Sequence, residues 1–141
     1  MSGSSRWVSV FVLGSLLFVS ACGSNPVMPV TGTVTRNGMP VPHLFINFVP
    51  DEGRPSWASS DTEGKFVLHY DAKEEGAMVG MHSVTVEVKP QSPKEEIDMM
   101  AGKVKQSPEI RAILNKYGRG KPNPLRFEIR RDTPMIELKL D

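Results

Sequence analysis

The sequence predicts a mainly β domain: a β-sandwich of about seven strands with Greek-key connections. Two observations favour this fold. Apolar side chains recur at every second position in runs such as 66–70 and 82–88, a spacing that places alternate side chains on one face of a strand. The stretches between the early strands are too short for a crossover helix, so antiparallel sheets with one buried face are expected.

The first 21 residues have the features of a secretory signal peptide. Arg6 supplies a positive start, and residues 7–18 form an apolar run broken only by Ser and Gly. About a dozen apolar residues are fewer than the roughly 20 that a membrane-spanning helix needs. The run closes with Val-Ser-Ala and then Cys22, which resembles the lipobox of bacterial lipoproteins.

Cys22 is the only cysteine, which excludes an intramolecular disulfide. The lipobox resemblance implies that Cys22 is lipidated, with acyl chains such as palmitate anchoring the mature protein to a membrane. The alternative is conventional cleavage after Ala21, with the cysteine there by chance. Gly23 in place of an acidic residue favours the outer membrane over the periplasmic face of the inner membrane. We therefore expect a signal peptide at 1–21, a tether at 22–29 and one β-sandwich domain at 30–141.

The charge of the mature chain argues against nucleic-acid binding. The chain has 17 basic and 16 acidic residues, and Arg6 lies in the leader, so 16 positive and 16 negative side chains remain after cleavage. A balanced chain without a basic patch lacks the electrostatic footprint of nucleic-acid binding.

Turn residues separate the expected strands. Asn37 and Gly38 predict a type I′ turn, because both tolerate positive φ, and Asp61 and Gly64 predict a second turn. The strands are expected, in order, at 30–35, 43–49, 57–60, 66–70, 82–89, 125–130 and 136–141. The last two runs alternate apolar and charged residues and are expected to pair as a closing β-hairpin.

A helical insertion is expected at about 93–118. Pro93 begins a short helical turn, and Ser107 followed by Pro108 is a typical helix start. Apolar residues at 110, 113 and 114 form one stripe of the second helix, and Gly118 is placed to end it.

Four motifs together resemble a known family. They are Val30-x-Gly-x-Val with the following Asn-Gly turn, Ile46-x-Phe48-x-Pro50, Ser60-Asp-Thr-Glu-Gly-Lys-Phe66, and Gly80-Met-His-Ser-Val-Thr-Val86. This order is similar to the carboxypeptidase regulatory-like domain, which has a transthyretin-like fold, in the form carried by small planctomycete lipoproteins. The resemblance covers about Val30 to Leu140 and implies a seven-stranded sandwich without catalytic residues. The insertion is longer than the usual loop of that family.

Candidate catalytic and metal-binding residues are few and isolated. His43, His69 and His82 lack the spacing of a zinc site; His82 is expected in the core or at its edge, and His69 at the surface. Ser59 and Ser60 beside Asp61 could suggest a nucleophile, but these residues also suit a turn. Four carboxylates could bind calcium if their loops converged, namely Asp51, Glu52, Asp61 and Glu63.

Trp57 leaves two alternatives open: an exposed indole could stack on a sugar or anchor a peptide, whereas a buried one would fill the sandwich, and burial is preferred.

The sequence thus predicts a lipid-anchored envelope protein with a non-catalytic binding or structural module, without metal or cofactor. Its partners would be the membrane, through Cys22, and an envelope protein or polysaccharide. The alternative is an accessory protein of an envelope hydrolase, binding carbohydrate or peptide.

Overall fold

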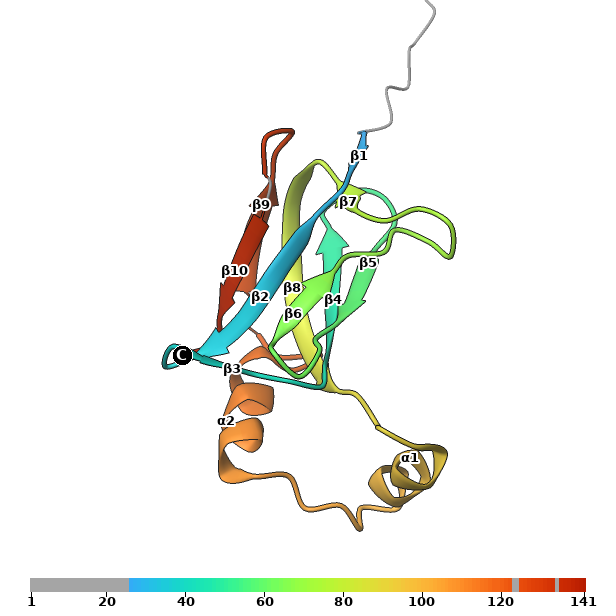
Figure 1. Ribbon diagram of the computed structural model, residues 1–141, viewed down its shortest axis with the longest axis vertical. Helices are drawn as coiled ribbons and strands as arrows, with labels where there is room; N and C mark the ends of the chain where they lie inside the picture. Colours follow the sequence, from blue (N-terminus) through green and yellow to red (C-terminus); the bar gives the residue numbers. More distant parts are fainter. Residues whose placement is uncertain (1–25, 123–124, 134) are drawn as a thin grey trace, which may run out of the picture.

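The computed structural model describes residues 26–122, 125–133 and 135–141 and is mainly β with two helices (Figure 1). The predicted signal peptide and Cys22 lie outside the described residues. The elements, in order, are β1 Val27–Met28, β2 Thr31–Arg36, β3 Met39–Pro40, β4 Leu44–Pro50, β5 Ser56–Ser59, β6 Lys65–Val67, β7 Ala77–Met78, β8 Gly80–Val88, α1 Pro93–Met100, α2 Pro108–Tyr117, β9 Leu125–Ile129 and β10 Met135–Lys139.

One sheet has four antiparallel strands in the order β5-β4-β8-β9. In its centre, Ile46 lies opposite Ala58 on one side and Val86 on the other, and all three are buried. The predicted alternation along β4 is confirmed, since Leu44, Ile46 and Phe48 are buried while Phe45 and Asn47 lie on the other face. One face of this sheet therefore belongs to the core and the other remains open.

The second sheet is built around β2, which pairs with β6 in antiparallel and with β10 in parallel orientation, while short β3 folds back on its end. Gly32 lies opposite both Phe66 and Ile136. A Cβ atom at position 32 would lie 2.4 Å from Cζ of Phe66 and 2.5 Å from the carbonyl oxygen of Ile136. Only glycine lets these three strands approach so closely.

Both sheets contribute to one hydrophobic cluster. The ring centroids of Phe48 in the first sheet and Phe66 in the second are 6.4 Å apart, and both side chains are buried. Ile113 and Tyr117 of α2 join the same cluster, so this helix closes the end of the core that lies away from β1 (Figure 1).

The prediction of a closing hairpin is wrong. β9 pairs with β8 in the first sheet, and β10 pairs with β2 in the second. A turn carries the chain between the sheets, and in it the hydroxyl of Thr133 accepts a hydrogen bond from the backbone N–H of Arg130 at 2.9 Å. The physical reason is that each run completes the edge of a different sheet, which buries Ile129 and Ile136 in the common cluster.

The turns and helices largely follow the sequence. Asn37 and Gly38 have φ of 49° and 76°, which confirms the type I′ turn, although it joins β2 to β3 rather than to β4. Helix α2 begins and ends as expected. The structure differs from the expected tether at residues 27 and 28, where Val27–Met28 pairs with Ala77–Met78 in a short antiparallel sheet.

Candidate binding surface

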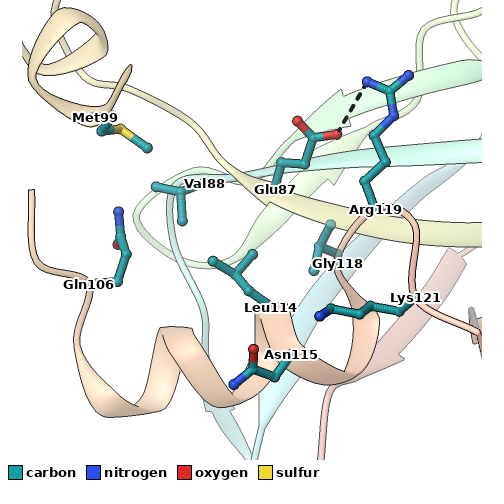
Figure 2. Close-up of a pocket in the computed structure, with 10 residues that line it drawn as sticks. Glu87, Val88, Met99, Gln106, Leu114, Asn115, Gly118, Arg119 and Lys121 are labelled. Atoms are coloured by element: carbon teal, nitrogen blue, oxygen red, sulfur yellow. Dashed lines mark ion pairs between the residues drawn. The ribbon is translucent and has the colours of Figure 1, made fainter. Parts of the chain in front are cut away.

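A hollow of about 430 Å³ lies between β8, α2 and α1 (Figure 2). We call it the helix-flanked hollow. Its lining combines apolar and polar side chains, namely Val86, Glu87, Val88, Met99, Gln106, Leu114, Asn115, Gly118, Arg119 and Lys121. Such a mixture of apolar lining with a few convergent polar groups is typical of binding sites.

The start and end of α2 fix one wall of this hollow. The Ser107 hydroxyl accepts a hydrogen bond from the backbone N–H of Ile110 at 3.2 Å, which caps the helix, while Leu114 is half-buried and faces the hollow. Gly118 ends the helix at φ −65°, not in the left-handed conformation expected of a terminal glycine. Its role is steric, because a Cβ atom there would lie 2.3 Å from the carbonyl oxygen of Leu114.

An ion pair separates this hollow from a second one. A side-chain nitrogen of Arg119 lies 4.0 Å from a carboxylate oxygen of Glu87, and the arginine side chain is 84% exposed. Because both charges are solvated, the pair adds little stability, but it keeps two charges at one place on the surface. Both residues also line a hollow of about 310 Å³ on the open face of the first sheet, together with Phe45, Asn47, Val49, Pro55 and Thr85.

Trp57 is 40% exposed, so the preferred expectation of a buried indole is wrong. The reason is its register: Ser56 and Ala58 take the inward positions of β5, which leaves Trp57 on the open face. Its ring stacks against His69, with centroids 4.7 Å apart, and against Phe45 at 6.0 Å. His69 is therefore half-buried rather than a freely solvated side chain.

The stacking limits what Trp57 can bind. His69 lies across the bridge on one side of Trp57 and Phe45 lies diagonally across on β4, so ring contacts on two sides reduce the area of the indole that a ligand could stack on. Stacking of a sugar requires an open ring face. We call Phe45, Trp57 and His69 the aromatic row. Its rings are thus better suited to contacts with the side chains of a peptide than to stacking on a sugar.

His82 lies in the core, with its ring edge-to-face against Phe48. Nδ1 donates a hydrogen bond to the carbonyl oxygen of Gly80 at 2.9 Å, since a carbonyl can only accept, and Nε2 is buried without a partner among the described residues. Burial lowers the pKa of His82 and outweighs the opposing effect of the Gly80 hydrogen bond.

Asp51 is used in an ion pair at the surface. Its carboxylate accepts two hydrogen bonds from the guanidinium of Arg126, each 2.8 Å long, and these bonds lower the pKa of Asp51. Within the described part of the chain, no three His, Cys, Asp or Glu side chains could together hold a metal ion. The loops of the four predicted calcium ligands therefore do not converge.

Ser60 and Asp61 are used in hydrogen bonds to the backbone. The Ser60 hydroxyl accepts from the backbone N–H of Leu44 at 2.9 Å and donates to the carbonyl of Val41 at 3.0 Å. One Asp61 carboxylate oxygen accepts from the backbone N–H groups of Glu63 and Lys65. The Asp61 bonds confirm its turn interpretation. The Ser60 hydroxyl does not bond the backbone of its own turn; it ties that turn to Val41 and to Leu44 at the start of β4.

The helix-flanked hollow was not expected from the sequence. The apolar stripe of α2 and the terminating Gly118 were recognised, but the position of α2 beside β8 depends on a long-range bridge between Val86 and Gly118 that no local pattern encodes.

No known protein family, curated protein or solved structure matches this chain. Within the described ranges, neither helix has the length and apolar character required to cross a bilayer.

Proposed function

We propose that this protein is a lipid-anchored component of the bacterial cell envelope whose β domain is a non-catalytic binding module. The lipobox-like residues ending at Cys22 support the anchor, and the balanced charge of the mature chain argues for a partner other than nucleic acid. The anchor would hold the protein at the outer membrane or at the periplasmic face of the inner membrane.

The proposed fold is a Greek-key β-sandwich of the transthyretin-like type, as in carboxypeptidase regulatory-like domains. Two sheets that share one hydrophobic cluster support it, and so does the passage of the chain from β9 in one sheet to β10 in the other. The parallel pairing of β2 with β10 gives the second sheet both strand orientations.

One observation carries the binding role: two hollows meet at the Glu87–Arg119 pair and lie beside an aromatic row. The surface offers apolar contacts at Leu114 and Phe45 and opposite charges between them. Because ring contacts on two sides reduce the area of Trp57 open to stacking, a peptide segment with apolar and charged side chains suits this surface better than a sugar ring does.

Metabolic labelling tests the anchor. Cells that express the full chain are grown with an alkyne-bearing fatty acid, and label on the purified protein is measured. The parental protein should carry label and the Cys22→Ala variant should not. Equal labelling of the two, or an unlabelled parental protein, would refute lipidation.

Tryptophan fluorescence tests the binding surface, because Trp57 is the only tryptophan that remains after removal of the leader. The acylated protein is titrated with a peptide library and, separately, with oligosaccharides. We expect saturable changes with peptides that weaken in an Arg119→Ser variant but not in an Arg131→Ser control. Saturable binding of oligosaccharides alone would instead support the carbohydrate-binding accessory role.

A further inference from the structure

Helix α1 exposes an apolar stripe to solvent. None of its eight residues is buried, and Ile97 and Met100 are 64% and 83% exposed. Local caps hold the helix: the Ser92 hydroxyl accepts from the backbone N–H of Glu95, whose carboxylate accepts from the backbone N–H of Gln91. A helix this short is marginal by itself, so the stripe points to a surface that covers it.

The hollow of the same chain does not cover this stripe. Met99 is the α1 side chain that lines the helix-flanked hollow (Figure 2). At about 100° per residue, Met99 is turned by roughly 200° from Ile97 and by roughly 100° from Met100. The side of α1 that faces its own hollow is therefore not the side that carries Ile97 and Met100, which stay exposed in the single chain.

The chain itself carries a surface that matches the exposed side of α1 in apolar character and has the opposite net charge. Helix α1 has a net charge of −2, from three carboxylates against one ammonium group: Glu95, Glu96 and Asp98 against Lys94. The rim of the helix-flanked hollow has a net charge of +1, from Arg119 and Lys121 against Glu87. Between those charges lie the apolar side chains of Val88 and Leu114.

We infer, building on the binding role proposed above, that the peptide segment bound at the helix-flanked hollow is α1 of a second copy of this chain. Ile97 and Met100 would contact Leu114 and Val88 of the other copy, and the acidic side of α1 would lie near Lys121. In a two-fold dimer each helix enters the other copy's hollow, so the contact is made twice. A single eight-residue helix covers less than the roughly 800 Å² per partner of a standard interface, and the reciprocal arrangement doubles it.

Disulfide trapping between two differently tagged full-length copies tests this contact. One copy carries Met100→Cys and the other Leu114→Cys, so a product bearing both tags forms only between copies. Met135→Cys is the matched control, because Met135 is an equally accessible methionine, 66% exposed, on β10. Copies without an added cysteine measure any product due to Cys22. If the dimer forms as proposed, the cross-tag product appears when the cysteines are at positions 100 and 114 and not when Met135→Cys replaces one of them. Absence of the product, or an equal amount of it with Met135→Cys, would overturn the proposal.

Two further variants test the chemistry of the contact. Ile97→Asp, at an exposed position outside the core, should reduce the cross-tag product about tenfold, since an interface anchor is lost. Glu96→Lys should reduce it about two- to fivefold, the range of an exposed ion pair. Adding Lys121→Glu to the other copy should restore it. An undiminished product with Ile97→Asp, or a loss that Lys121→Glu does not reverse, contradicts the proposed docking.

Discussion

The buried His82 makes the stability of the domain depend on pH. Its ring is fully buried, Nδ1 donates to the Gly80 carbonyl, and burial lowers its pKa in the folded state. Protonation would place a second N–H, at Nε2, where no described acceptor lies within reach. The exposed pair of Asp51 and Arg126 acts on the ring with opposite signs, so burial remains the largest influence.

The direction and size of the effect follow from proton linkage. In the unfolded chain this histidine has an ordinary pKa of about 6.5, so below that pH the unfolded chain binds a proton that the folded state does not bind until a lower pH. The free energy of unfolding should therefore have its full value above about pH 6.5, where neither the folded nor the unfolded chain binds this proton. It should fall by at most about 1.4 kcal/mol per pH unit below pH 6.5, until the folded-state pKa is reached.

Urea unfolding between pH 7.5 and 5.5, followed by circular dichroism, measures this slope. His82→Phe is the comparison, because phenylalanine keeps an aromatic ring beside Phe48 and cannot be protonated. The parental protein should lose stability as the pH falls, and the variant should lose clearly less. Identical slopes for the two proteins would refute the assignment of the effect to His82.

Three further predictions concern local structure. Ser60→Ala should lower the free energy of unfolding by about 1–3 kcal/mol, measured in urea, because the buried backbone N–H of Leu44 loses its acceptor. Gly64→Ala should lower the melting temperature, because Gly64 has φ of +72° and an added Cβ would lie 2.7 Å from a carbonyl oxygen of β2; an unchanged melting temperature would contradict that geometry. Trp57 emission, measured on a protein of residues 22–141, should be quenched by iodide, because the side chain is 40% exposed. Resistance to iodide would show that the ring is covered.

Much of the fold could be predicted because its signals are local. The alternation along β4 requires only that every second residue be apolar, and the Asn37-Gly38 turn only that both residues tolerate positive φ. The capped start of α2 at Ser107 is equally local. For these elements, propensity and burial pattern favour the same structure.

Pairing and exposure could not be predicted in the same way. Alternating runs at 125–129 and 135–139 fit a hairpin as well as two separate sheet edges, and only the position of β2 and β8 decides between them. Trp57 shows the same limit. A shift of one residue would place it inside the core, and its register depends on pairing with Asn47 of β4.

The parallel pairing of β2 with β10 links residues near the two ends of the described part of the chain. Thr31 lies opposite Met135, more than a hundred positions later in the chain, and the hydroxyl of Tyr117 donates to the backbone carbonyl of Asp141. Because the chain is synthesised from its N-terminus, β2 is complete long before β10 exists to cover it. Until then one side of β2 offers an open strand edge, so the incomplete sheet is exposed to aggregation while synthesis continues.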